Sequence, residues 1–138
     1  MQLCVEALNE SVKGLSSKMS LHICYSGNDY RSLFPECLDL KIDQYVLEFA
    51  NRDTLSLGVG SDNRRGYAPL EFFKEYGDKR EIGLGVVDVH TDEIESPELI
   101  RDRILYAVKV LDNPSQINVN PDCGLRTRSR SVSYTHLR

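Results

Sequence analysis

The sequence lacks the features that mark membrane proteins and small secreted proteins. No apolar run approaches the ~20 residues of a transmembrane helix, and no charged leader precedes an apolar stretch near Met1. The 4 cysteines are too few and too unevenly spaced for a disulfide framework. We therefore expect a cytoplasmic protein without membrane association, whose thiols are free or bind metal.

An excess of positive charge is missing as well. The chain has 17 basic and 21 acidic side chains and a net charge of -4. Its only basic cluster is Arg126, Arg128 and Arg130, which is typical of a solvated loop. The sequence therefore gives no support to nucleic-acid binding. It also shows no internal repeat and no low-complexity linker.

Helical and strand-like patterns alternate along the chain. Apolar spacing and end signals predict helices over residues 3–18, 29–40, 67–76 and 97–112, and strands over residues 20–25, 44–49, 82–89 and 116–120. A turn at residues 27–29 precedes the second helix, and Pro35 should kink that helix or divide it in two. Residues 51–66 are polar and rich in glycine, which predicts a long loop. Gly83 and Gly85 indicate close backbone approach within the third strand.

Two helices carry clear apolar stripes. The first has its stripe at Leu3, Val5, Leu8, Val12 and Leu15, and the last has Ile100, Ile104, Val108 and Leu111. Ser96 and Pro97 form a strong start signal for the last helix, and Asn113-Pro114 should end it.

Alternating strands and helices favour parallel strands joined by right-handed crossovers. Polar and reactive residues follow the strands, as in a (β/α)8 TIM barrel, which normally needs about 250 residues. The predicted fold class is therefore α/β, with about four β/α units forming the C-terminal half of such a barrel.

Four potential metal ligands lie at or near the ends of predicted strands. His22 and Cys24 are two residues apart on one strand, so their side chains point to the same face. Glu48 lies in an apolar strand, where a carboxylate is unfavourable unless it is paired or bound to metal. Cys123 follows the last strand, after Pro121. Imidazole, thiolate and carboxylate groups together match the ligands of a tetrahedral zinc ion.

The same residues have simpler interpretations. His22 could be a hydrogen-bonded core histidine, Cys24 and Cys123 could be small buried residues, and Glu48 could pair with Arg52. The spacing of these residues does not decide between a zinc site and an ordinary core.

Four blocks of sequence resemble the C-terminal catalytic domain of cobalamin-independent methionine synthase. They are His-Ile-Cys-Tyr-Ser at 22–26, Val-Leu-Glu at 46–48, Ile-Gly-Leu-Gly-Val-Val-Asp-Val-His at 82–90 and Val-Asn-Pro-Asp-Cys-Gly-Leu-Arg-Thr-Arg at 119–128. They occur in the family's order and with compatible spacing, and the resemblance extends to about Arg130.

The resemblance implies a zinc enzyme that transfers a methyl group from 5-methyltetrahydropteroyl-polyglutamate to homocysteine and forms methionine. It implies that His22, Cys24, Glu48 and Cys123 bind the zinc ion. It also implies that His90 protonates the departing folate nitrogen; the alternative is an ordinary exposed loop histidine, and the matching block favours the catalytic role.

The resemblance also limits what is expected of this chain. The family's pockets for the amino acid and the folate are expected upstream of Met1, so no substrate-binding residue is assigned. We expect a partial catalytic barrel domain over residues 1–130 and a non-native tail over residues 131–138, outside the fold. Cys4 and Cys37 are expected to be structural thiols rather than ligands.

Two other functions remain open. A related zinc alkyltransferase that acts on another thiol, such as coenzyme M, or uses another methyl carrier would need the same zinc residues. The chain could also be an inactive, merely metal-binding half-domain, because an open half barrel leaves two sheet edges unpaired. The sequence does not predict an oligomeric state.

Overall fold

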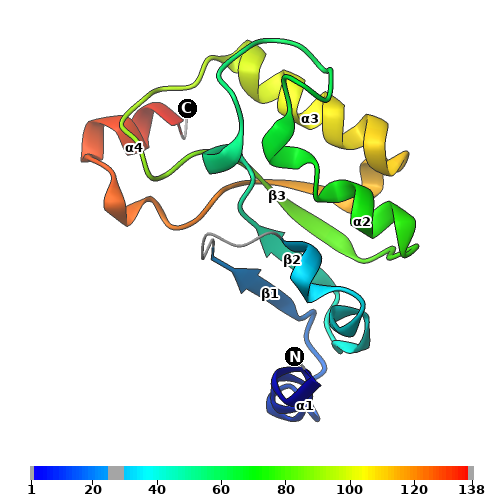
Figure 1. Cartoon of the computed structure of the whole chain (residues 1–138). Helices are drawn as coiled ribbons and strands as arrows, with labels where there is room; N and C mark the ends of the chain where they lie inside the picture. Colours follow the sequence, from blue (N-terminus) through cyan, green and yellow to red (C-terminus); the bar gives the residue numbers. More distant parts are fainter. Residues whose placement is uncertain (1, 25–29, 137–138) are drawn as a thin grey trace.

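The computed structural model describes residues 2–24 and 30–136 and contains one parallel sheet (Figure 1). Its strands are β1 (Ser20–Ile23), β2 (Gln44–Leu47), β3 (Glu81–Val87) and β4 (Ile117–Pro121), and they lie side by side in chain order. The helices are α1 (Gln2–Ser11), α2 (Leu70–Glu75), α3 (Pro97–Leu111) and α4 (Arg130–His136). The predicted parallel α/β architecture is confirmed, because every pair of adjacent strands is parallel.

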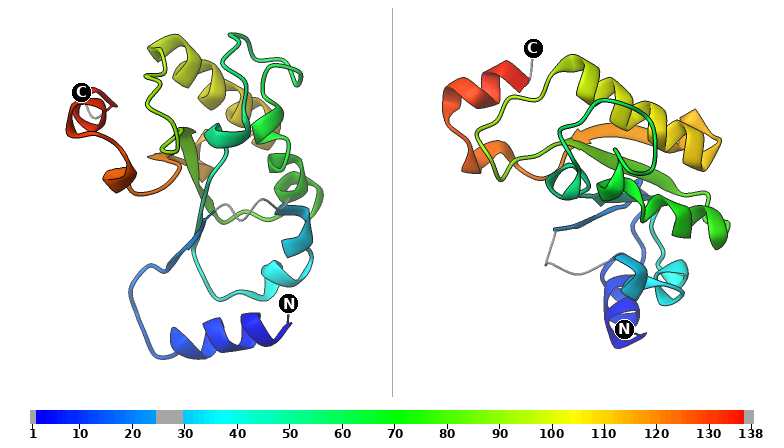
Figure 2. Two further views of the ribbon diagram at one scale, coloured as in Figure 1. Left: turned by 60° about the vertical axis from the view of Figure 1, so that its left-hand side comes forward. Right: turned by 45° about the horizontal axis from the view of Figure 1, so that its top comes forward.

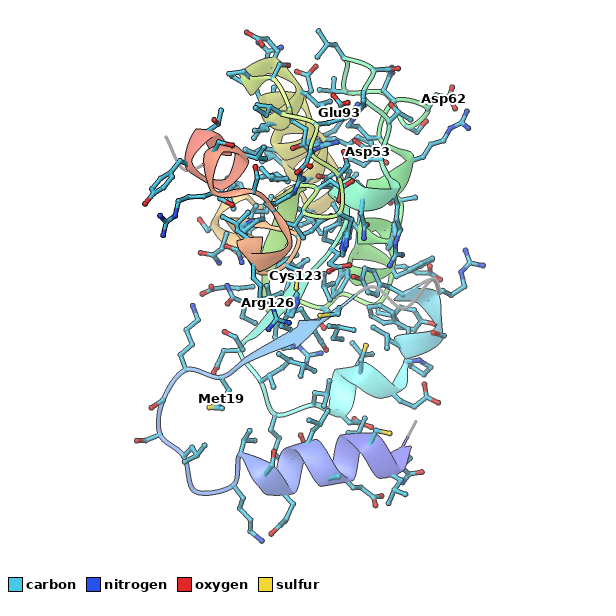
Figure 3. All side chains as sticks on the ribbon, turned by 90° about the vertical axis from the view of Figure 1, so that its left-hand side faces the viewer. Met19, Asp53, Asp62, Glu93, Cys123 and Arg126 are labelled. Carbon is cyan, nitrogen blue, oxygen red and sulfur yellow. The ribbon has the colours of Figure 1, made fainter. Side chains whose placement is uncertain are left out.

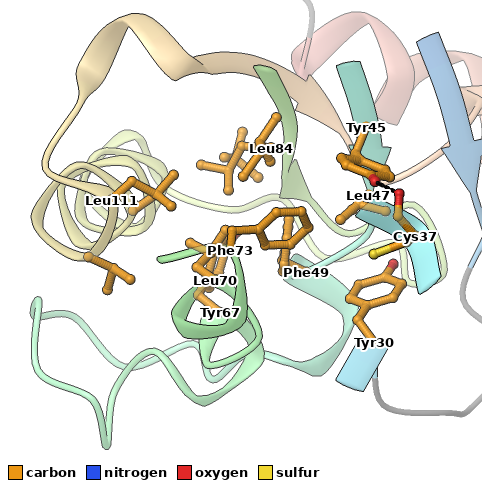
Figure 4. Close-up of a cluster of buried hydrophobic side chains, with 14 of the residues drawn as sticks. Tyr30, Cys37, Tyr45, Leu47, Phe49, Tyr67, Leu70, Phe73, Leu84 and Leu111 are labelled. Atoms are coloured by element: carbon orange, nitrogen blue, oxygen red, sulfur yellow. Dashed lines mark hydrogen bonds between the residues drawn. The ribbon is translucent and has the colours of Figure 1, made fainter. Parts of the chain in front are cut away.

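The hydrophobic core lies between one face of the sheet and the helices α2 and α3. Both helices lie on the same side of the sheet (Figure 2). Leu47 and Leu84 of the sheet meet Leu70 and Phe73 of α2, and Leu111 closes the core from α3 (Figure 4). All five side chains are buried. This layer holds the strands in place and leaves their other face available for polar residues.

The opposite face of the sheet is polar, because side chains alternate between the two faces of a strand. Ser20 Oγ donates a hydrogen bond to Gln44 Oε1 at 2.7 Å. Asn118 Nδ2 donates to Glu81 Oε2 at 2.6 Å, and Gln44 Nε2 donates to the same oxygen at 3.3 Å. These bonds link all four strands at their amino ends. His22 lies on this face, towards the carboxyl ends.

The predicted start and end of α3 are confirmed, but its predicted buried face is partly wrong. Ser96 Oγ accepts a hydrogen bond from the Leu99 N–H, and Asp112 ends the helix in the left-handed conformation. Ile100, Ile104 and Val108 are only half-buried. The residues that face the core are Leu99, Arg103, Tyr106, Ala107, Val110 and Leu111. Arg103 lies at the centre of that face, and the apolar pattern gave no sign of a buried arginine.

The first helix is shorter and more exposed than predicted. It ends at Ser11, whose hydroxyl donates to the Leu8 carbonyl, and Gly14 then turns the chain with φ +82°. Val5 is its only buried residue, while Leu3 and Leu15 are exposed. Asn9 fastens the helix to the segment before β2, because its side chain bonds to the Asp39 carbonyl and the Lys41 N–H.

The segment around Pro35 forms two short pieces, as predicted. They are the 3-10 helices η1 (Tyr30–Leu33) and η2 (Glu36–Asp39). The turn predicted at residues 27–29 lies outside the described residues. The predicted loop over residues 51–66 overlaps two further 3-10 turns, η3 (Ala50–Arg52) and η4 (Arg65–Tyr67).

The end of the chain differs from the prediction in one respect. No helix was expected after Arg130, and residues 131–138 were left out of the predicted fold as a non-native tail, but Arg130–His136 form the helix α4. Ser133 Oγ reaches the Leu125 carbonyl at 3.4 Å, which places this helix against the segment after β4. That these residues are non-native stays a prediction. In the part of the chain that the structure describes, the helices lack the length and the apolar character that a membrane span requires.

Candidate metal centre

The four predicted ligands come together at the carboxyl end of the sheet. His22 lies in β1, Cys24 follows β1, Glu48 follows β2 and Cys123 follows β4. One potential ligand atom from each residue lies within 4.8 Å of all the others. Figure 3 shows Cys123 close to the carboxyl end of β1. The parallel arrangement explains this convergence, since it brings all four strand ends to one edge.

The distances among the His22 nitrogen and the two sulfur atoms fit a tetrahedral zinc ion. Cys24 Sγ lies 3.1 Å from His22 Nε2, and Cys123 Sγ lies 3.4 Å from the same nitrogen. The two sulfur atoms are 3.7 Å apart. Zinc bonds of about 2.0 Å to nitrogen and 2.3 Å to sulfur would separate a nitrogen and a sulfur ligand by about 3.5 Å and two sulfurs by about 3.8 Å. The types of the four donors, and the spacing of the nitrogen and the two sulfurs, therefore fit zinc.

The ring of His22 is oriented for metal binding by the adjacent strand. Its Nδ1 lies 3.0 Å from the Val46 carbonyl, which can only accept a hydrogen bond. Nδ1 must therefore carry the proton, and Nε2 keeps its lone pair towards the two sulfur atoms. Metal-bound histidines in proteins commonly have such a bond from the other ring nitrogen.

Glu48 is the buried member of the group, with only 1% of its surface exposed. The Tyr30 hydroxyl accepts a hydrogen bond from the Glu48 N–H at 3.0 Å and donates to its carbonyl at 3.1 Å. Asn51 Nδ2 donates to Glu48 Oε2 at 3.0 Å. Both the backbone and the carboxylate are thus held in place, as expected of a buried charged group with a defined role.

His90 lies beside the four ligands, on the segment that follows β3. Its Nε2 is 3.6 Å from Glu48 Oε1, and about half of its side chain is exposed. The His90 N–H donates to Asp88 Oδ1 at 2.7 Å, which fixes the backbone at this point. The predicted proton donor and the predicted metal ligands therefore share one site.

The Cys123 thiol influences the ionisation of Cys24. Hydrogen bonding to Cys123 raises the pKa of Cys24, with smaller contributions from desolvation and from the charges of Cys123 and Glu48. A bound divalent cation would reverse this tendency, because it favours the thiolate form of its ligands. The electrostatics thus suit a site that ionises when it takes up a metal.

The other two cysteines lie outside this group. Cys37 is buried, and burial raises the pKa of its thiol. Cys4 is exposed on α1, so the expectation that it is a packed structural thiol is wrong. Neither residue is within reach of the four ligands.

Sequence reasoning missed the residues that support the ligands. Asp122 is fully buried, and its carboxylate accepts hydrogen bonds from the backbone N–H groups of Phe49, Ala50 and Asn51. Burial raises the pKa of Asp122 to about 6, while the three donors oppose that rise. Its position next to Cys123 was a signal, but nothing in the sequence showed that its side chain reaches another strand.

A family model for the catalytic domain of cobalamin-independent synthases matches residues 4–138. The methionine synthase of Thermoplasma acidophilum is 47% identical over 142 residues, covering 100% of this chain and 41% of that protein. The methionine synthase of Pyrococcus furiosus is 38% identical over 135 residues, covering 98% of this chain and 35% of that protein. The chain thus spans about two fifths of the length of these curated relatives.

A solved structure has a similar fold. It is a B12-independent methionine synthase from Shewanella sp. W3-18-1 in complex with selenomethionine. The TM-score is 0.72 with 23% identity, over 94% of this chain and 38% of the other. The four consecutive strands and their helices are therefore part of a (β/α)8 barrel, as predicted.

Proposed function

Because this chain belongs to the family of catalytic domains of cobalamin-independent synthases, we propose that it carries the zinc site and the proton donor of a methionine synthase. The reaction transfers a methyl group from 5-methyltetrahydropteroyl-polyglutamate to homocysteine. The observation that carries this proposal is the convergence of four suitable ligand atoms within 4.8 Å at the carboxyl end of a parallel sheet. The neighbouring His90 supplies the second group that the chemistry needs.

The zinc ligands in this proposal are His22, Cys24, Glu48 and Cys123. Bound zinc would favour the thiolate form of homocysteine and, having no redox chemistry of its own, would not oxidise it. Val46 and Asn51 serve the site by orienting His22 and Glu48. A reducing compartment such as the cytoplasm suits a centre that depends on two free thiols.

His90 acts as the general acid. As the sulfur of homocysteine forms its bond to the methyl carbon, the bond between that carbon and the folate nitrogen breaks. A proton from His90 passes to the departing nitrogen, so that an amine leaves rather than its anion. Since about half of the His90 side chain is exposed, solvent can restore the proton. The backbone bond to Asp88 keeps the ring next to the ligands while this happens.

Zinc content tests the first half of the proposal. The chain should bind one zinc ion, and Cys123→Ser should abolish binding, since a neutral hydroxyl replaces a soft anionic ligand. A Cys4→Ser, Cys37→Ser double variant is the matched control and should keep the full zinc content. Zinc loss in the double variant, or retention in Cys123→Ser, would overturn the ligand assignment.

Methyl transfer tests the second half, in a chimera where this chain replaces the corresponding segment of the Thermoplasma acidophilum methionine synthase. His90→Asn should keep its zinc, while single-turnover transfer falls by about 100- to 10,000-fold, the effect typical of losing a general acid. Normal turnover by His90→Asn would mean that the acid is another residue.

A further inference from the structure

The carboxylate of Asp122 links two strands that are not neighbours. Asp122 follows β4, and its own N–H donates to the Val87 carbonyl of β3 at 2.9 Å. Its side chain then crosses β3 and meets the backbone after β2. Oδ1 accepts hydrogen bonds from Phe49 at 2.9 Å and Ala50 at 3.0 Å, and Oδ2 accepts one from Asn51 at 2.7 Å. Three N–H groups from consecutive residues are thus held by one buried carboxylate.

Gly85 of β3 makes room for this crossing. A Cβ atom added at Gly85 would lie 2.1 Å from Asp122 Oδ1 and 2.7 Å from the Leu47 carbonyl oxygen. Contacts this short do not occur between real atoms, so any side chain at position 85 would displace the carboxylate or the neighbouring strand. The hydrogen bonds of the Asp122 carboxylate therefore require a glycine at position 85.

Both ends of this link are adjacent to proposed zinc ligands. Cys123 directly follows Asp122, and Glu48 directly precedes Phe49. Asn51 extends the link, because its backbone N–H is bound by Asp122 and its side-chain amide donates to Glu48. The relative position of Cys123 and Glu48 thus depends on a contact that exists without any metal.

We propose that Asp122, crossing over Gly85 and acting through Asn51, is a positioning residue that sets Cys123 against Glu48 before the metal binds. This inference rests on the proposed zinc site. Without the hydrogen bonds of Asp122, zinc binding must itself order the loops after β2 and β4. The free energy of that ordering reduces the affinity for zinc. Loss of such supporting contacts in metal sites typically weakens binding by about 10- to 100-fold.

Two substitutions test the link from opposite sides. Asp122→Asn replaces one acceptor oxygen by a donor that faces N–H groups. Gly85→Ala leaves every donor and charge in place and pushes on the carboxylate. Gly83→Ala is the matched control, on the same strand and the same face. Its added Cβ would lie 2.6 Å from the amide end of the flexible Asn120 side chain, 3.0 Å from Val46 Cγ2 and 3.2 Å from Val46 Cα, so it crowds the same face of the sheet, and its three nearest atoms do not include Asp122.

Zinc affinity, measured by competition with a chromophoric chelator, should fall about 10- to 100-fold for Asp122→Asn and Gly85→Ala and stay within about twofold for Gly83→Ala. Cobalt(II) gives a second readout, because its visible spectrum reports the number and geometry of its ligands. The first two variants should lose d–d intensity as Glu48 is replaced by water. A change that only destabilised the fold would leave the spectrum of the folded, loaded chain unchanged.

The outcomes separate this inference from the proposed function. If the wild-type chain binds no zinc, the proposed zinc site itself fails. If it binds zinc and both variants match Gly83→Ala in affinity and spectrum, the positioning role is wrong and the zinc site stands. Should both variants fail to fold, Asn51→Ala removes only the side-chain link to Glu48. It should weaken zinc binding about tenfold, and unchanged affinity would overturn the inference.

Discussion

Arg103 is a buried cation on α3, and replacing it by methionine perturbs a network of charges beneath the site. Its side chain is 1% exposed. Nε lies 3.1 Å from Asp53 Oδ2, and Nη1 lies 2.8 Å from both Glu95 Oε1 and the Val86 carbonyl. Methionine keeps the length of the stem and its apolar contacts. It removes the guanidinium that these three groups share.

The expected loss of stability follows from these contacts. Removing one partner of a buried ion pair costs about 3 to 5 kcal/mol. Asp53 keeps Arg64, whose Nη1 is 2.9 Å away, which favours the lower end of that range. The Val86 carbonyl loses a donor, which adds about 1 kcal/mol. We therefore expect Arg103→Met to lower the free energy of unfolding by about 3 to 4 kcal/mol.

Urea unfolding in the presence of a chelator measures this change without a contribution from metal. The sequence has no tryptophan, so tyrosine fluorescence and circular dichroism are the suitable probes. Lys13→Met is the control, because Lys13 pairs with Glu10 on the surface of α1 with both side chains more than two-thirds exposed. It should change stability by less than about 0.5 kcal/mol. A similar small change for Arg103→Met would refute the reasoning.

The stability lost in Arg103→Met should depend on pH in a defined direction. Burial raises the pKa of Asp53, and Arg64 and Arg103 oppose that rise. A carboxyl group whose pKa is raised by folding stabilises the native state at low pH and loses this contribution as the pH increases. Removing Arg103 raises the pKa of Asp53 further. The difference in unfolding free energy between variant and wild type should therefore shrink as the pH falls, because the variant's native state takes up the Asp53 proton at a higher pH than the wild type does.

Three further predictions concern the thiols, the metal and α3. A mild oxidant should join Cys24 and Cys123 in the metal-free chain, because their sulfurs are 3.7 Å apart; peptide mapping should find this disulfide, and saturating zinc should prevent it. Zinc at 100 times its dissociation constant should raise the unfolding free energy by about 2.7 kcal/mol, and Cys123→Ser should show no such increase. Ser96→Ala removes the cap that accepts from Leu99 and should cost about 1 kcal/mol in urea unfolding, whereas no loss would mean that the cap is redundant.

The strands were predictable because their patterns were simple. Residues 82–89 form an almost wholly apolar run, and β3 is the strand buried on both faces. The sequence also predicted close approach at Gly83 and Gly85, and the structure confirms both positions. It could not say what approaches them. Asn120 approaches Gly83 and Asp122 approaches Gly85, and both positions depend on the register of β4 against β3.

The buried face of α3 was harder to predict for a physical reason. A pattern of apolar residues treats every arginine as exposed, yet Arg103 is buried because acidic groups from two other segments neutralise it. The helix therefore turns Leu99, Arg103 and Tyr106 inward and leaves Ile100 and Ile104 at the edge. Burial of a charge depends on partners that are distant in sequence, and one sequence does not reveal them.

The site itself was identified in two different ways. The side chains of His22 and Cys24 were expected on one face from the period of a strand, and this is what the structure shows. Glu48 and Cys123 were added because they lie in and after predicted strands, whereas the role of His90 came only from the resemblance. Their convergence is a property of the parallel sheet, which brings residues up to 101 positions apart into contact.

Different buried carboxylates position the proposed metal ligands and the proposed proton donor. Asp122 fastens the loops that carry Glu48 and Cys123. Glu95 accepts from the Asp88 N–H, and Asp88 in turn holds the His90 N–H. Because Arg103 contacts Glu95 and not Asp122, its loss should disturb the segment of His90 more than the metal ligands. Zinc affinity and proton transfer should therefore respond to different substitutions, since separate contacts position the two groups.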